Sequence, residues 1–254
     1  MNNERLIQKI EKLSINAFPS LQTQLVDGWL LRFSDGYSKR ANSINPIYRS
    51  SGKTCEKIKM VEQVYQERNL PVMYKLTSRV FPENLDNILE QADYSLEGLT
   101  SVQVLSLHEF SVPFQSSSTS AIYNSFEDQW FKNFCELNSM KESDQLILKK
   151  MLERIVPKAC YVVLYNDKKD VVACGMGVLE DNYLGLFDIV TNPKERNKGY
   201  GMQLLLTILN WGKTNGAKDA YLQVVPDNLP ALHLYAKLGF TEAYKYWYRI
   251  KRFE

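Results

Sequence analysis

A strand-like segment, a short glycine-containing loop and a helix-like segment follow one another between residues 183 and 214, and this succession constrains the fold most. YLGLFDIVT is apolar and rich in β-branched residues, whereas MQLLLTILNWGK carries apolar residues at helical spacing. The loop between them, RNKGYG at 196–201, combines two glycines with basic side chains. Because the first amides of a helix lack partners and carry partial positive charge, such a loop can bind an anion such as a diphosphate. Taken alone, the loop could equally be a plain turn, since it fits neither a dinucleotide-binding nor a Walker pattern.

A second pattern follows the next strand-like segment. Asn228 precedes Tyr235 by seven residues, or two helical turns, which puts both side chains on one face. Gly239 and Phe240 then end the helix and begin the last strand. Together with the loop, NLPALHLYAKLGF resembles the GNAT family of GCN5-related N-acetyltransferases. The matching residues, in the family's order and spacing, are Arg196, Gly199, Gly201, Asn228, Ala231, Tyr235, Gly239 and Phe240.

The resemblance implies an α+β fold, with mixed twisted sheets flanked by helices, and acetyl-CoA as cosubstrate. It implies that the strand before the loop splays from its neighbour and that the pantetheine arm of the cofactor fills the opening. Ile189, Val190 and Thr191 would pair with that arm, and Asn228 would hydrogen-bond to it. The amides that would hold the pyrophosphate belong to Arg196, Asn197, Lys198, Gly199, Tyr200, Gly201 and Met202.

The same resemblance implies direct attack of an amine on the thioester in a ternary complex, without a covalent enzyme intermediate. Tyr235 would be the general acid that protonates the leaving thiolate, and the alternative is a core aromatic residue. Asp188, an acid within an otherwise apolar strand, is the best candidate for the general base, although it could instead bond a neighbouring loop or an arginine. Glu180 is a weaker candidate. The acceptor, a small-molecule or peptide amine, is not specified by the sequence.

The first half of the chain is predicted to be a degenerate copy of the second, which is the simplest account of a few shared identities. Sliding the chain so that Asn45 lies on Asn192 also places Gly52 on Gly199. Because Thr54 then stands where Gly201 stands, the first half is predicted to be catalytically silent and to shape the acceptor pocket. The predicted division is a GNAT-like domain at 1–112, a serine-rich linker at 113–122 and a catalytic domain at 123–254.

Two arginines of the first half, Arg32 and Arg40, could bind an acidic acceptor, but surface ion pairing is the favoured explanation for them.

Composition excludes several other classes. Lys and Arg number 31 and Asp and Glu 29, so the net charge of +2 argues against a nucleic-acid partner. Four dispersed cysteines and two histidines predict no metal site and fit a reducing cytoplasm. The charged N-terminal helix is unlike a signal peptide, and no apolar run is long enough to span a membrane. The alternative to an enzyme is a non-catalytic acetyl-CoA sensor or structural protein.

Overall fold

The structure is a computed structural model that describes residues 3–108, 110 and 119–253. Its helices are α1 (Asn3–Ala17), α2 (Thr54–Gln66), α3 (Leu85–Gln91), α4 (Asp128–Asn138), α5 (Glu142–Leu152), α6 (Tyr200–Thr214) and α7 (Leu229–Lys237), with a 3₁₀ turn η1 (Pro193–Glu195). Its strands are β1 (Gln22–Val26), β2 (Trp29–Phe33), β3 (Ile44–Pro46), β4 (Val72–Thr77), β5 (Ser95–Ser106), β6 (Thr119–Tyr123), β7 (Lys158–Tyr165), β8 (Val171–Glu180), β9 (Tyr183–Thr191), β10 (Asp219–Val224) and β11 (Thr241–Lys251).

The two halves repeat one succession of elements. In the first half the order is β1-β2-β3-α2-β4-α3-β5, and in the second half it is β7-β8-β9-α6-β10-α7-β11. In each half the strand before the first of these helices runs parallel to the strand after it, as β3 does with β4 and β9 with β10. The predicted α+β architecture is therefore confirmed, and the internal copy inferred from the sequence has a structural counterpart.

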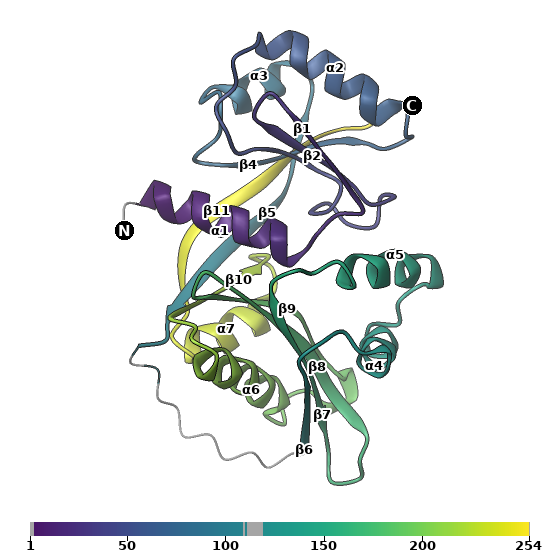
Figure 1. Cartoon of the computed structure of the whole chain (residues 1–254), viewed down its shortest axis with the longest axis vertical. Coiled ribbons are helices and arrows are strands. Elements are labelled where there is room, and N and C mark those ends of the chain that lie inside the picture. The colour runs from purple at the N-terminus through teal and green to yellow at the C-terminus, as the bar shows by residue number, and fades with distance from the viewer. Residues whose placement is uncertain (1–2, 109, 111–118, 254) are drawn as a thin grey trace.

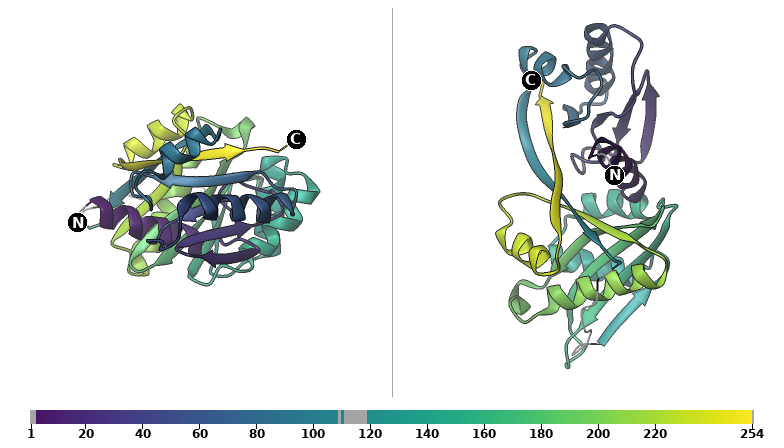
Figure 2. Two further views of the ribbon diagram at one scale, coloured as in Figure 1. Left: turned by 90° about the horizontal axis from the view of Figure 1, so that it is seen from above. Right: turned by 90° about the vertical axis from the view of Figure 1, so that its left-hand side faces the viewer.

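The halves exchange their last strands. Within the described residues the strands form one sheet in the order β1-β2-β3-β4-β11-β5-β10-β9-β8-β7-β6. Strand β5 of the first half lies beside β10, and β11 of the second half lies beside β4, with both pairings antiparallel. Figures 1 and 2 show these two long strands running side by side from one half into the other. At the far end of β11, Arg249 forms an ion pair with Asp86 of α3 at 2.8 Å.

The predicted linker lies partly outside the described residues, which omit 111–118. Its last residues, from 119 to 122, belong to β6, which pairs with β7 at the edge of the sheet. The proposed division into two domains stays a prediction.

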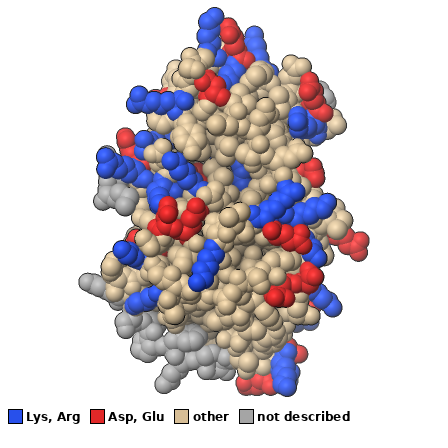
Figure 3. Space-filling view, in the orientation of Figure 1, with Lys and Arg blue, Asp and Glu red and all other residues tan. Residues whose placement is uncertain are grey.

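Helices cover both faces of the second half of the sheet. Along β7, Tyr161 and Val163 belong to the buried cluster that includes α4 and α5, whereas Val162 and Leu164 belong to the cluster that includes α6. Because side chains alternate along a strand, α4 and α5 lie on one face and α6 on the other. Acidic and basic side chains are interspersed over the face shown in Figure 3.

A third cluster, formed by the helices and strands of the first half, includes Trp29 and Tyr74. None of the helices in the described part of the chain combines the length and apolar character needed to cross a bilayer.

Candidate active site

A wedge opens between the parallel strands β9 and β10. Their pairing ends at Gly185 and Tyr221, although β9 continues to Thr191 and β10 to Val224. The other edges of both strands remain paired, β9 with β8 and β10 with β5. The splayed strand predicted from the sequence is therefore confirmed, and it leaves a sheet edge available to an extended ligand.

Aromatic side chains close the narrow end of the wedge. A Cβ atom on Gly185 would lie 2.5 Å from Phe187 and 2.7 Å from Tyr221, so only glycine fits there. The rings of Phe187 and Tyr221 meet edge to face with centroids 6.0 Å apart. The point at which the strands separate is thus fixed by packing rather than by hydrogen bonds alone.

The loop at the open end delivers the start of α6 to the wedge. Asn192 accepts a hydrogen bond from the amide of Lys194 at 3.0 Å and so caps η1. Asn197 and Gly199 then adopt positive φ angles of 63° and 86°, and Gly199 is the N-cap of α6 without a side-chain capping bond. The first amides of α6 are consequently left without the usual side-chain acceptor, as an anion site requires.

A cavity of about 970 Å³ lies along this loop, the end of β9 and the first turns of α7. The predicted site residues that line it are Ile189, Thr191, Arg196, Asn197, Gly199, Tyr200, Gly201, Met202, Asn228 and Tyr235. Val190 packs instead against the cluster on the opposite face of the sheet, and Lys198 forms an exposed ion pair with Glu195 at 2.9 Å. Most of the predicted cofactor residues are therefore brought together, while the side chains of these two do not line the cavity.

The two loop glycines differ in what a side chain would meet. A Cβ atom on Gly201 would lie 3.2 Å from Cδ2 of Leu234 and 3.5 Å from Oγ1 of Thr191, inside the cavity. A Cβ atom on Gly199 would meet nothing within 4 Å, so conformation rather than space requires glycine there. The bare backbone at Gly201 fits a diphosphate that approaches the amides closely, as coenzyme A would.

Tyr235 lies on the wall of the cavity formed by α7. Its side chain is 8% exposed and packs edge to face against Phe240, with ring centroids 6.0 Å apart. Burial raises the pKa of its hydroxyl above the ordinary value, so the phenol stays protonated at neutral pH. This state is the one that a general acid needs.

Asn228 is occupied in part by its own helix. Its Oδ1 atom accepts a hydrogen bond from the amide of Ala231 at 3.3 Å and caps α7. Since an amide side chain also carries two donors, Nδ2 is the group with which it could reach a ligand in the cavity. The sequence analysis did not predict that Asn228 is the N-cap of α7, although asparagine before Leu-Pro is a common capping signal.

Asp188 lies on a β-bulge of β9. The register of β8 and β9 shifts between Cys174 and Met176, opposite Asp188, whose φ is 53°. Its Oδ2 atom is enclosed and has no hydrogen-bond partner within the described residues. Burial raises the pKa of this carboxyl, and the charge of Arg40 partly opposes the shift. A carboxylate of raised pKa beside the wedge can take a proton from an amine.

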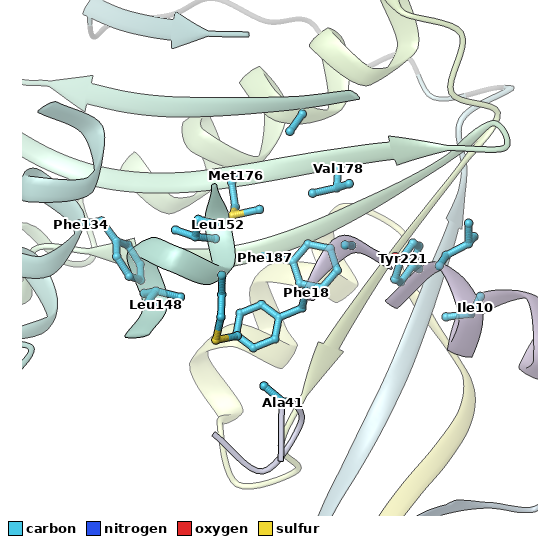
Figure 4. Packing of buried hydrophobic residues seen from close by; sticks show 14 of the residues in the cluster. Ile10, Phe18, Ala41, Phe134, Leu148, Leu152, Met176, Val178, Phe187 and Tyr221 are labelled. Carbon is cyan, nitrogen blue, oxygen red and sulfur yellow. The ribbon is translucent and has the colours of Figure 1, made fainter. Parts of the chain in front are cut away.

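The neighbourhood of Asp188 includes residues of the first half that sequence reasoning did not connect with it. Phe18 and Ala41 belong to the same buried cluster as Phe187, and Figure 4 shows the three side chains near one another. The guanidinium carbon of Arg40 lies 4.5 Å from the ring centre of Phe18. The sequence offers no signal for this contact beyond the presence of Arg40 itself. The position of Leu234 in the cavity wall was also not predicted, because a leucine on an amphipathic helix is usually a core residue.

The expectation that Arg32 and Arg40 form surface ion pairs is wrong. Arg32 is 3% exposed and donates hydrogen bonds to the carbonyl oxygens of Arg40 and Phe18, so it fixes the chain internally. Among the described residues, Arg40 has no carboxylate within ion-pair distance.

The corresponding loop of the first half holds an anion supplied by the chain itself. The carboxylate of Asp27 accepts hydrogen bonds from the amides of Ser51 and Gly52 at 2.9 and 3.0 Å, just before α2. Lys57 of α2 donates to the same carboxylate at 3.0 Å. These bonds hold the pKa of Asp27 well below its ordinary value. An internal carboxylate therefore occupies the position at which the second half has its open amides.

Comparisons with known proteins agree with this geometry. The family model described as "Probable histone acetyltransferase Rv0428c C-terminal" matches residues 5–249. A relative from Bacillus subtilis (strain 168), "Uncharacterized N-acetyltransferase YobR", is 31% identical over 251 residues, which cover 97% of this chain and 99% of the relative.

Solved structures extend the likeness to the fold. A GCN5-related N-acetyltransferase from Kribbella flavida matches with a TM-score of 0.70 and 13% identity, covering 97% of this chain and 96% of that one. A tandem GNAT protein from the clavulanic acid biosynthesis pathway matches with a TM-score of 0.66 and 11% identity, covering 96% and 87%. With a family model and a relative that span nearly the whole chain, the protein belongs to the acetyltransferase family of that model and is an N-acetyltransferase, and it has the GNAT fold.

Proposed function

We propose that this N-acetyltransferase uses acetyl-CoA and transfers the acetyl group to a primary amine by direct attack in a ternary complex. The observation that carries the proposal is the wedge between β9 and β10, which opens beside the bare amides at the start of α6. An extended arm with a diphosphate at one end needs both features, and here they line one cavity.

The chain's residues divide the work of binding between backbone and side chains. The amides from Arg196 to Met202 would hold the diphosphate, and the free edge of β9 from Ile189 to Thr191 would pair with the pantetheine arm. Asn228 would donate from its Nδ2 atom to the arm while its Oδ1 atom caps α7. Acetyl-CoA supplies the acetyl group as a thioester, whose carbonyl carbon accepts the amine and whose sulfur leaves.

Proton transfer falls to the half-buried Asp188 and the buried Tyr235. Asp188 would take one proton from the acceptor's ammonium, which leaves a neutral amine able to attack. Tyr235 would give its hydroxyl proton to the departing sulfur and regain one from the acetylated nitrogen through solvent. The net reaction forms a C–N bond, breaks a C–S bond and releases one proton.

The test is release of free thiol from acetyl-CoA with a panel of amines, combined with calorimetry of CoA binding. Tyr235→Phe removes the hydroxyl and keeps the ring that packs on Phe240, so turnover should fall by roughly 10²–10⁴-fold while CoA affinity changes little. Ala236→Ser, at an exposed position of the same helix that does not line the cavity, is the control for helix disturbance. Equal turnover in Tyr235→Phe and the parent enzyme would remove Tyr235 from this role.

The alternative is a protein that binds acetyl-CoA as a sensor or structural ligand. CoA binding without turnover on any amine would favour it over the transferase. The proposal includes a cytoplasmic location, which the four free cysteines Cys55, Cys135, Cys160 and Cys174 support because thiols persist in a reducing compartment.

A further inference from the structure

The loop of residues 34–43, which joins β2 to β3, reaches from the first half to the bulge of β9. Arg40 on this loop lies with its guanidinium carbon 4.5 Å from the ring of Phe18 and 6.0 Å from the ring of Phe187. Phe187 directly precedes Asp188 in the chain. The first half therefore places a cation near the point at which β9 carries the half-buried carboxylate of Asp188.

The backbone of this loop is held rigidly. The carbonyl oxygen of Arg40 accepts a hydrogen bond from Nη1 of Arg32 at 2.6 Å. Oδ1 of the buried Asn42 accepts from the amides of Ser34 and Gly36 at 2.7 and 3.0 Å, and its Nδ2 donates to the carbonyl of Ser38 at 2.8 Å. A cation on such a support keeps its position before a ligand arrives, which reduces the ordering cost of binding.

Arg40 and Asp188 carry opposite charges, and within the described residues neither side chain forms an ion pair. Arg40 and Asp188 are near enough for the charge of one to affect the other, yet no ion pair within 4.0 Å joins them, and Oδ2 of Asp188 has no hydrogen-bond partner among the described residues. Arg40 is half-buried against Phe18 and pairs with no other carboxylate in the described chain. A half-buried guanidinium and a carboxylate with one enclosed oxygen, both without ionic partners, are each costly unless a ligand contacts both.

We propose that Arg40 and Asp188 form the acceptor subsite, and that the acceptor is an amine that also carries a carboxylate a few atoms away, such as a free amino acid. The acceptor's ammonium would face Asp188, and its carboxylate would face the planar guanidinium, which suits a two-pronged contact. This inference rests on the proposed function, since it names the substrate class of that same site. It also gives the first half a role in choosing the substrate, through Arg40.

The experiment compares free amino acids with their carboxamides and with the corresponding decarboxylated amines as acceptors, by thiol release from acetyl-CoA. The parent enzyme should acetylate at least one amino acid with kcat/KM about 10-fold or more above that of its carboxamide. Arg40→Gln should lower kcat/KM for the amino acid by roughly 10- to 100-fold more than it lowers kcat/KM for the carboxamide.

Lys39→Gln is the matched control, since Lys39 lies on the same loop and its ammonium faces Glu97 at 3.2 Å. It removes the same charge and should leave the preference for the carboxylate intact. Should Arg40→Gln not fold, Arg40→Lys keeps the charge without the planar fork and should lower the preference in part.

The outcomes separate the two proposals. Turnover of plain amines and carboxamides at rates equal to those of amino acids would overturn the inference and leave the proposed transferase standing. An unchanged preference in a folded Arg40→Gln variant would overturn it as well. Absence of turnover with every amine would overturn the proposed function and the acceptor class with it.

Discussion

Replacing Gly201 by alanine should separate cofactor binding from folding. Gly201 is the second residue of α6 with an ordinary helical backbone, so alanine should favour the helix by about 0.5–1 kcal/mol. The new Cβ atom would lie 3.2 Å from Leu234 and 3.5 Å from Thr191, which requires a small shift of a flexible leucine. These effects oppose each other, and the melting temperature should change little.

Coenzyme A binding should weaken in the same variant. The added methyl group projects between β9 and α7, where it would push a phosphate away from the amides of α6. Loss of one hydrogen bond to a charged group costs about 1.5–3 kcal/mol. At about 1.4 kcal/mol for each tenfold change, this is a loss of roughly 10- to 100-fold in affinity.

Gly199→Ala is the matched comparison. Its Cβ atom would enter open space, but its φ of 86° makes alanine cost about 1–2 kcal/mol in the folded chain. Calorimetry with coenzyme A and thermal unfolding should therefore rank the two variants in opposite orders, with Gly201→Ala the weaker binder and Gly199→Ala the less stable protein. Unchanged affinity in Gly201→Ala would refute the reasoning, because the phosphates would then not contact these amides.

Three further predictions concern buried or paired charges. Burial raises the pKa of Asp188, so kcat/KM should fall as the pH decreases through a value above the pKa of a free aspartate. Asp188→Asn should be slow and should lack this acidic limb of the pH profile, and an acidic limb that persists in the variant would contradict the role of Asp188. Lys75→Met leaves the buried Glu11 without its 2.7 Å ion pair and should lower the free energy of unfolding in urea by about 3–5 kcal/mol. The exposed Lys53→Met should lower it by less than about 1 kcal/mol, and equal losses in the two variants would contradict the effect of burial. The pKa of Asp27 is lowered in the fold, so the stabilising effect of its carboxylate is present above about pH 4 and is lost as the pH falls further. Asp27→Asn should flatten the dependence of unfolding free energy on pH in this range, and an unaltered slope would assign that dependence to other groups.

Local patterns in the sequence were sufficient for the parts of the site that depend on neighbours along the chain. The glycines before α6 and the Asn-to-Tyr spacing of α7 follow from helix geometry, so the elements and most lining residues could be predicted. The bulge at Asp188 was visible only as an acid within an apolar strand. Its positive φ depends on the register with β8, which the sequence does not display.

Features that join distant parts of the chain could not be predicted. The exchange of β5 and β11 has no local signal, because each strand has the same alternating pattern whichever neighbour it pairs with. The contact of Arg40 with Phe187 depends on that same arrangement. The edge strands β1 and β6 were missed because their residues are largely polar or exposed, which removes the usual alternation.

The exchange of β5 and β11 also determines when the chain can finish folding. During synthesis β4 emerges well before β11, which covers its edge and is the last strand of the described residues. Until β11 is synthesised, the edge of β4 in the amino-terminal sheet stays unpaired, and an unpaired edge can pair with other nascent chains. A truncation of the last dozen residues should accordingly damage the half of the molecule that was made first.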